Sequence, residues 1–205
     1  MRIAVDAMGG ECGPEIVVKA AVEAAISDPS DLTMVVVGDG DRLESVLGKI
    51  SSVPANIEIA HASQIVEMSE APAVAIRKKK DSSIAVALGL MKDRAVDGIV
   101  TTGNTGAMVG GALVTLGRLH GVSRPGMAMF YPTRSGWVVI LDIGANSTCT
   151  PKNLIQFGIM GSVFSEYHLD IRNPRVGLLN IGEERSKGTD VVKEAYELLD
   201  RKSVV

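Results

Sequence analysis

The chain has 205 residues, of which 46% are hydrophobic but only 3% aromatic, and its formal net charge is −3 at pH 7. This length supports one substantial core, which must be built mainly from aliphatic side chains. The weakly negative charge gives no reason to expect a nucleic-acid partner.

Membrane-spanning and exported proteins are disfavoured by the sequence. No apolar run approaches the roughly 20 residues that a membrane helix needs, and residues Met1–Asp6 enter a strand-like run without a signal peptide. Cys12 and Cys149 form neither a disulfide framework nor a zinc pattern. We therefore expect a cytoplasmic protein with two free thiols.

Apolar runs alternate with segments of helical period along the chain. Strands are predicted at Arg2–Ala7, Leu32–Gly38, Ile57–Ala62, Gly98–Thr102, Met127–Tyr131, Trp137–Ile143 and Val176–Ile181. Helices are predicted at Pro14–Ile26, Asp41–Lys49, Ala73–Lys80, Ser83–Asp93, Thr105–Leu119, Pro151–His168 and Thr189–Arg201. Pro14 and Pro151 suit first-turn positions, and Thr150 suits the cap before the latter.

The strand patterns predict the fold class. Runs such as Val35–Val37 are continuously apolar, which indicates a mainly parallel sheet buried between helix layers. The segment Met127–Ile143 holds two strands too close for a crossover helix, so we expect a hairpin. The sequence predicts a single α/β domain over residues 1–205, a three-layer α/β/α fold with a mainly parallel mixed sheet. Within it, Thr105–Leu119 is apolar nearly all round and is interpreted as a buried core helix.

The most informative stretch is Thr101–Met108, in which a short apolar run ends in Gly-Asn-Thr-Gly and turns into a helix. Glycine lets the backbone turn tightly, and the unpaired N–H groups and dipole of a helix start favour negative charge. The sequence therefore predicts an anion site here, for a ligand that carries phosphate or carboxylate.

Four further turns rich in Gly, Asp and Asn follow other strands, at Asp6–Gly10, Gly38–Gly40, Asp142–Asn146 and Asn180–Glu184. Each alone fits ordinary turn chemistry, and we keep that interpretation for Gly38–Gly40. Ligands of open parallel sheets bind beyond the carboxyl ends of the strands, so the turns together predict one cleft. Its expected binding residues are Asp6, Gly9, Gly10, Gly103, Thr105, Gly106, Asp142, Asn180, Gly182 and Gly188.

Common catalytic signatures are absent from the sequence. There is no dinucleotide fingerprint, no Walker-type lysine and no Gly-x-Ser-x-Gly nucleophile elbow. His61, His120 and His168 have no partners that indicate a metal site or a triad, so we expect no metal and no cofactor. The basic run Arg77–Lys80 is interpreted as a solvated helix end. Lys187 fits either an ammonium group beside a bound phosphate or a solvated lysine near a helix cap.

The turns, in their order, resemble the PlsX family of phosphate acyltransferases of bacterial phospholipid synthesis. The resemblance extends from Met1 to about Leu199. The stretches that carry it are Asp6-Ala-Met-Gly-Gly10, Thr102-Gly-Asn-Thr-Gly-Ala107, Leu141-Asp-Ile-Gly-Ala-Asn146 and Arg175-Val-Gly-Leu-Leu-Asn-Ile-Gly182 with Lys187-Gly188. It implies a fold similar to isocitrate and isopropylmalate dehydrogenases, a homodimer, and transfer of an acyl group from acyl-carrier protein to inorganic phosphate. A membrane acyltransferase would consume the acyl phosphate, which implies a possible peripheral association with the inner membrane face.

That reaction needs no nucleophilic side chain, because phosphate itself attacks the thioester. The helix-start amides of Asn104–Ala107 are suited to holding the anion, and we hypothesise that Lys187 offsets charge on the phosphate or the oxyanion. Asn146 and Asn180 would add neutral hydrogen bonds. Catalytic roles are thus expected for Lys187, Asn104 and Asn146.

The chain departs from the family pattern at several positions. Glu11-Cys12 stands where the family usually has Asp-His, Thr148-Cys149 where it often has an acid and a small residue, and Val74 where a basic residue is common. Family members also continue past residue 205, so we expect the chain to be truncated relative to them and to expose apolar edges.

Three alternatives remain beside the phosphate acyltransferase. A phosphotransacetylase-like enzyme would use acyl-CoA with the same fold and anion site. A non-catalytic remnant would keep only the fold and the dimer surface. An NAD-dependent dehydrogenase is the least favoured, because the chain has no dinucleotide signature.

Overall fold

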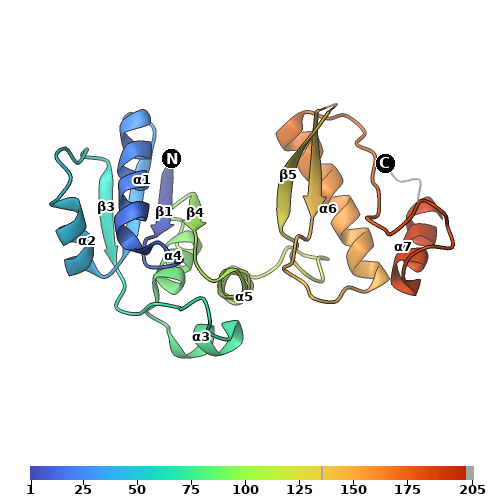
Figure 1. Ribbon diagram of the computed structural model, residues 1–205, viewed down its shortest axis with the longest axis horizontal. Helices are drawn as coiled ribbons and strands as arrows, with labels where there is room; N and C mark the ends of the chain where they lie inside the picture. Colours follow the sequence, from blue (N-terminus) through green and yellow to red (C-terminus); the bar gives the residue numbers. More distant parts are fainter. Residues whose placement is uncertain (135, 202–205) are drawn as a thin grey trace. The chain divides into compact units, whose positions relative to one another are not determined.

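The computed structural model describes residues 1–134 and 136–201 (Figure 1). The chain forms two compact units, Met1–Gly117 and Arg118–Val205, which we call unit 1 and unit 2. Helices and strands occur in both, which confirms the α/β class. That the two units make one domain stays a prediction.

Unit 1 contains a four-stranded sheet in which every neighbouring pair is parallel. Its strands are β1 (Arg2–Asp6), β2 (Thr33–Gly38), β3 (Ile57–His61) and β4 (Gly98–Thr101), in the order β3-β2-β1-β4. Asp6 at the end of β1 pairs with Val37 on one side and with Thr101 on the other. The carboxyl ends of β1, β2 and β4 therefore lie at the same edge of the sheet, and the turns that follow β1 and β4 are adjacent.

Helices cover both faces of this sheet. On one face, α1 (Gly13–Ser27) and α2 (Gly40–Leu47) bury Val18 and Leu43 against side chains of β1 and β2. On the other, α4 (Ser83–Lys92) buries Ala87 against the opposite side chains of the same strands. Because β2 is covered on both sides, its continuously apolar run Val35–Val37 is explained, and the predicted three-layer arrangement is confirmed in unit 1.

Helices α3 (Pro72–Lys78) and α5 (Thr105–Thr115) pack beside α4. The glycines of α5 permit this close approach. A Cβ atom at Gly110 would lie only 2.8 Å from Cδ1 of Ile76 in α3. The density of small residues in this helix therefore reflects helix packing.

The expectation of a buried core helix over Thr105–Leu119 is wrong in most of its length. The helix ends at Thr115, and only Ala107 and Gly111 in it are buried, while the Val114 side chain is 71% exposed. The apolar pattern covers the whole circumference, but α3 and α4 pack on the glycine-bearing side alone, so the remaining apolar side chains stay accessible.

Unit 2 contains a hairpin of β5 (Ala128–Thr133) and β6 (Gly136–Leu141), together with α6 (Pro151–Leu169) and α7 (Asp190–Arg201). The antiparallel pairing confirms the predicted hairpin, although the hairpin forms a two-stranded sheet of its own. Helix α6 packs against β6 and α7. Although α6 has 19 residues, no helix in the described part of the chain is both long and apolar enough to cross a membrane.

The predicted strand Val176–Ile181 is wrong. The described segment is irregular, and its backbone forms no ladder hydrogen bond with another described segment. The side chains of Leu179 and Ile181 are 94% and 88% exposed. An apolar run alone does not make a strand, because backbone N–H and C=O groups need a paired neighbour to form a sheet.

The cap of α6 has the geometry that its sequence predicts. The hydroxyl of Thr150 accepts a hydrogen bond from the backbone N–H of Asn153 at 3.3 Å, and the Asn153 side chain accepts one from the Thr150 N–H at 2.9 Å. We expect Thr150→Ala to lower the free energy of unfolding by about 1 kcal/mol, because an unpaired helix-start donor replaces the cap. Urea denaturation of this variant beside Thr150→Ser, which keeps the hydroxyl, measures the effect. Equal losses in both variants would contradict the assignment of the cap.

Candidate functional site

The turns after β1 and β4 lie against one another in unit 1, and we call residues 6–10 and 101–106 the strand-end site. Their backbones approach so closely that a Cβ atom at Gly9 would lie 2.8 Å from Cα of Gly103. A Cβ atom at Gly10 would lie 2.5 Å from the Thr102 hydroxyl oxygen. Glycine is required at these positions because of proximity, and the two turns are in direct backbone contact.

Asp6 joins the two turns through a buried carboxylate, which is only 1% exposed. Its Oδ1 accepts hydrogen bonds from the backbone N–H groups of Met8 at 3.2 Å and Gly9 at 3.1 Å. Its Oδ2 accepts one from the Thr101 hydroxyl at 2.7 Å. Three donors from the protein itself satisfy this carboxylate, so Asp6 organises the turns. Direct contact of Asp6 with a ligand stays a prediction.

Two threonine hydroxyls complete the connection between the turns. The Thr101 hydroxyl oxygen accepts a hydrogen bond from the Gly103 N–H at 2.9 Å, and the Thr102 hydroxyl donates to the Gly9 carbonyl at 3.2 Å. The candidate residues chosen from the sequence include neither threonine. Their role depends on β4 lying beside β1, which the sequence of either strand does not reveal.

Asn104 caps α5, and its side chain is fully engaged by the protein. Its Oδ1 accepts a hydrogen bond from the Ala107 N–H at 3.0 Å. Its Nδ2 donates to the carbonyl oxygens of Glu67, Met68 and Glu70 at 3.1 to 3.3 Å. With 6% of Asn104 exposed, these contacts fix the helix start against the loop before α3. A catalytic role for this side chain stays a prediction.

The first turn of α5 offers backbone N–H groups to a ligand. Neither Thr105 nor Gly106 donates its amide to any acceptor within the described residues. A Cβ atom at Gly106 would lie 2.5 Å from Cγ of Pro72, so the start of α5 is packed tightly against the start of α3. Unpaired amides and the positive end of the helix dipole together favour an anion.

Lys79 holds the loop before α3 in place. Its ammonium group donates to the Ile65 carbonyl at 2.5 Å and forms an ion pair with the Glu70 carboxylate. The hydrogen bond from Lys79 is the largest cause that lowers the pKa of Glu70 below its usual value. The interpretation of Arg77–Lys80 as a solvated helix end is therefore wrong for Lys79, because its stem is partly buried and its charge is paired. The sequence of the basic run does not show which of its lysines is paired, because adjacent lysines have the same side chain.

In unit 2, Asp142 shapes the turn that follows β6. It adopts a left-handed backbone conformation with φ of 67°. Its Oδ1 accepts hydrogen bonds from the backbone N–H of Asn146 at 3.3 Å and from Asn146 Nδ2 at 3.2 Å. Asn146 Nδ2 also donates to the Pro125 carbonyl at 2.9 Å. Asp142 and Asn146 are thus joined within one turn, while their contact with a substrate stays a prediction.

The two free cysteines are expected to differ in reactivity. Cys12 is exposed. Burial, followed by the nearby Asp142 carboxylate, raises the pKa of the Cys149 thiol above its usual value, so less thiolate forms at neutral pH. We expect iodoacetamide at pH 8 to alkylate Cys12 about tenfold faster than Cys149. Mass spectrometry of the two peptides over time measures the ratio, and preferential labelling of Cys149 would contradict it.

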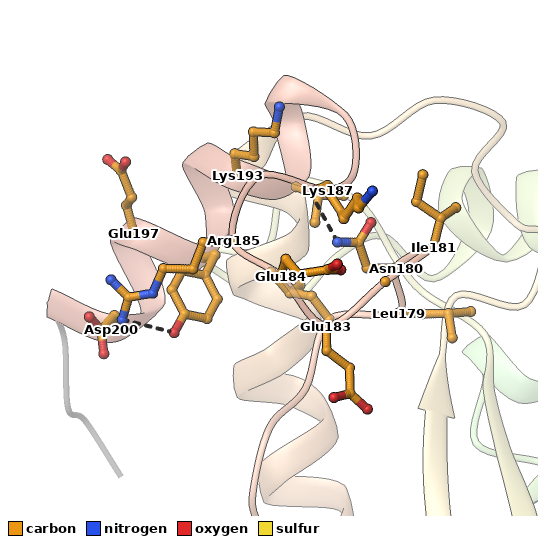
Figure 2. Close-up of a pocket in the computed structure, with 14 residues that line it drawn as sticks. Leu179, Asn180, Ile181, Glu183, Glu184, Arg185, Lys187, Lys193, Glu197 and Asp200 are labelled. Carbon is orange, nitrogen blue, oxygen red and sulfur yellow. Dashed lines mark hydrogen bonds between the residues drawn. The ribbon is translucent and has the colours of Figure 1, made fainter.

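The predicted residues Asn180, Gly182 and Lys187 line a hollow of about 640 Å³ between the 178–187 segment and α7, which we call the α7 hollow. Figure 2 shows Asn180 and Lys187 in this lining. The fourth predicted residue of this group, Gly188, lies against Asn180. Asn180 Nδ2 donates to the Lys187 carbonyl at 3.1 Å. Gly188 has a φ of 89°, and a Cβ atom there would lie 2.3 Å from Asn180 Oδ1. Both the backbone conformation and the close approach therefore require glycine at position 188.

Charges of both signs surround the α7 hollow. Four carboxylates and three cations line it, and Arg185 lies over the Tyr196 ring with 5.4 Å between its Cζ atom and the ring centroid. Lys193 is 3.8 Å from Asp190, whereas Lys187 has no ion-pair partner among the described residues. Lys187 thus brings an exposed ammonium group without an ion-pair partner among the described residues to this hollow, which agrees with both of its sequence interpretations.

The candidate residues therefore form three groups, in the strand-end site, beside Asp142 and around the α7 hollow. A single cleft that joins these groups stays a prediction.

The Gly38–Gly40 turn fits its interpretation as ordinary turn chemistry, because Asp39 caps α2 by accepting a hydrogen bond from the Arg42 N–H. Within residues 1–134 and 136–201, no cluster of three or more His, Cys, Asp or Glu side chains has the arrangement of a metal site.

Known proteins resemble the chain in sequence and in fold. A phosphate acyltransferase of Alkaliphilus oremlandii is 44% identical over 198 residues, which is 97% of this chain and 58% of that protein. One from Oleidesulfovibrio alaskensis is 47% identical over 197 residues, or 96% of this chain and 56% of that protein. The EutD phosphotransacetylase from Staphylococcus aureus shares the fold with a TM-score of 0.66 at 19% identity, covering 99% of this chain and 64% of that one.

The curated relatives are longer than this chain, which spans about three fifths of the length of those it matches. Residues 1–204 match the family model described as fatty acid synthesis protein. Together with more than 40% identity to phosphate acyltransferases over nearly the whole chain, this match establishes the family. The chain belongs to the fatty acid synthesis protein family, which is the PlsX family that its turns resemble.

Proposed function

We propose that the protein transfers an acyl group from acyl-carrier protein to inorganic phosphate. The observation that carries this proposal is the strand-end site, where the amides of Thr105 and Gly106 have no acceptor within the described residues and begin a helix. Such amides bind a phosphate dianion through hydrogen bonds and the helix dipole. The names of the curated relatives support the same reaction.

The reaction needs positioning and charge stabilisation more than it needs a reactive side chain. A phosphate oxygen forms a bond to the thioester carbonyl carbon, and the carbonyl oxygen gains negative charge. The carbon–sulfur bond then breaks, the thiolate of the carrier protein leaves, and acyl phosphate remains. Holding phosphate close to the carbonyl and aiming donors at the developing oxyanion supply the rate enhancement.

The remaining candidate residues have roles in this proposal that require the three groups to share one cleft. Lys187 offsets negative charge on phosphate or on the oxyanion. Asn180 adds a neutral hydrogen bond. The Nδ2 group of Asn146 already donates to Asp142 at 3.2 Å and to the Pro125 carbonyl at 2.9 Å, so Asn146 acts in this proposal by ordering the turn after β6. These assignments follow from the family resemblance and from the unpaired ammonium group of Lys187.

Partners and location form a further part of the proposal. Acyl-carrier protein delivers the acyl group, and a membrane acyltransferase that uses glycerol 3-phosphate receives the acyl phosphate. The protein itself is a cytoplasmic homodimer that associates peripherally with the membrane.

The exposed apolar side chains Val114 and Leu116 near the end of α5 are compatible with burial between subunits. Light scattering of the purified chain measures the mass, and a monomer at micromolar concentration would contradict the dimer.

The function is tested by supplying phosphate with either acyl-carrier-protein thioester or acyl-CoA and following release of the free thiol. We expect phosphate-dependent release from the carrier-protein thioester and little from acyl-CoA. Faster turnover of acyl-CoA would favour a phosphotransacetylase-like enzyme instead. Calorimetry with inorganic phosphate separates both from a non-catalytic remnant, since absence of binding and of turnover would overturn the proposed function.

A further inference from the structure

We propose that the Thr101 hydroxyl is a positioning group that acts through the buried carboxylate of Asp6 and sets the strand-end amides in place for phosphate. This inference rests on the proposed function, because phosphate is the ligand whose binding it controls. Thr101 does not touch the substrate in this proposal. The Thr101 hydroxyl determines the position of the backbone N–H groups in the turn that follows β4.

The direction of the hydrogen bonds between Gly103, Thr101 and Asp6 is fixed by chemistry. An ionised carboxylate only accepts, so the Thr101 hydroxyl must donate its proton to Asp6 Oδ2 at 2.7 Å. The oxygen of that hydroxyl then accepts the Gly103 N–H at 2.9 Å. The Gly103 amide is thereby committed to the protein, while the amides of Thr105 and Gly106 remain without an acceptor among the described residues.

The charge of Asp6 has no counter-cation within the described residues, so hydrogen bonds alone satisfy it. Loss of a donor to a buried carboxylate is strongly unfavourable, and the turn must shift or admit water to replace it. The space for such a shift is small, because Gly9 and Gly103 are already in close backbone contact. A displacement of about 1 Å at a positioning group lowers the rate about 100-fold.

Kinetics of Thr101→Val, Thr101→Ser and the unaltered 205-residue chain test the inference. We expect Thr101→Val, which keeps the shape and loses the hydroxyl, to raise the KM for phosphate at least about tenfold and to leave the KM for acyl-carrier protein within about twofold. Thr101→Ser restores the hydroxyl and should rescue the KM for phosphate. A general loss of structure would instead change both KM values or lower the concentration of active protein.

A matched control exists elsewhere in unit 1. The Ser63 hydroxyl donates to the Asp81 carboxylate at 2.5 Å on an exposed part of the surface. Ser63→Ala therefore removes a hydroxyl–carboxylate hydrogen bond that involves no residue of the strand-end site, and we expect both KM values to stay unchanged. An equal rise of the phosphate KM in Ser63→Ala and Thr101→Val would overturn the inference.

Hydrogen exchange gives a readout that does not depend on turnover. In Thr101→Val, the amides of Gly9 and Gly103 should exchange faster than in the unaltered chain, with exchange in the centre of β2 unchanged. Unchanged exchange at both glycines overturns the inference, even if the unaltered chain has no activity and the proposed function fails.

If Thr101→Val does not fold, Asp6→Asn supplies the second variant. Its amide group donates where the carboxylate accepts, so the same rise in phosphate KM is expected, and an unchanged KM overturns the inference.

Discussion

Gly9→Ala is expected to destabilise unit 1 by about 3 kcal/mol and to abolish phosphate binding at the strand-end site. The added Cβ atom would lie 2.5 Å from Asp6 Oδ2 and 2.8 Å from Cα of Gly103. Neither neighbour is the end of a flexible side chain free to move away, because Asp6 is held by three hydrogen bonds and the other atom is backbone. The two turns must therefore separate.

The matched control is Gly89→Ala in α4, where a Cβ atom would meet nothing within 4 Å. Alanine is favoured over glycine in a helix by about 0.5–1 kcal/mol, so this variant should be more stable than the unaltered chain. Hydrogen exchange of the amides of β1 and β2 measures the stability of unit 1. Trp137 fluorescence does not suffice, since the chain's single tryptophan belongs to unit 2. Destabilisation of the same size at both glycines would contradict the close-contact explanation.

Local signals in the sequence located most of the secondary structure. Pro151 begins α6 and Thr150 caps it, because a missing N–H and a hydroxyl acceptor both suit a helix start. The continuous apolar run of β2 correctly indicated a strand covered on both faces. These features depend on a few neighbouring residues, so they can be recognised without knowledge of the rest of the fold.

Features that depend on distant partners could not be predicted in the same way. Val176–Ile181 has the composition of a strand, but no described neighbour pairs with its backbone. Lys79 has the same side chain as its neighbours in a basic run. Its ion pair with Glu70, nine residues earlier, forms because the loop before α3 brings Glu70 beside it. The extent to which α5 is covered depends on how many helices pack around it, which its own apolar pattern does not specify.

The same distinction applies to the candidate site. The glycines and the capping asparagine of Thr101–Met108 indicate an anion site because helix starts have common chemistry. The hydroxyl of Thr101 gains its role only because Asp6, 95 residues earlier, lies on the adjacent strand. The sequence thus identified the candidate anion-binding amides, while the side chains that contact their turn could be identified only from the strand order.

Lys187→Ala is expected to lower kcat/KM for acyl phosphate formation about 100-fold while the chain remains folded. Lys187 is exposed and has no ion-pair partner among the described residues. Removal of such a side chain changes the free energy of unfolding by less than about 0.5 kcal/mol. A large effect on turnover would therefore come from lost stabilisation of negative charge on phosphate or on the oxyanion, in accordance with the function proposed above.

Lys193→Ala is the matched control, because Lys193 also lines the α7 hollow and carries the same charge. It lies on α7, 3.8 Å from Asp190, and we expect its removal to change kcat/KM by less than about twofold, as for a surface pair. Lys187→Arg keeps the positive charge and should retain part of the activity. Free-thiol release from acyl-carrier protein at varied phosphate concentration measures all three variants. Equal losses in Lys187→Ala and Lys193→Ala would indicate a general effect of charge in the hollow, whereas unchanged turnover in Lys187→Ala would remove Lys187 from the reaction.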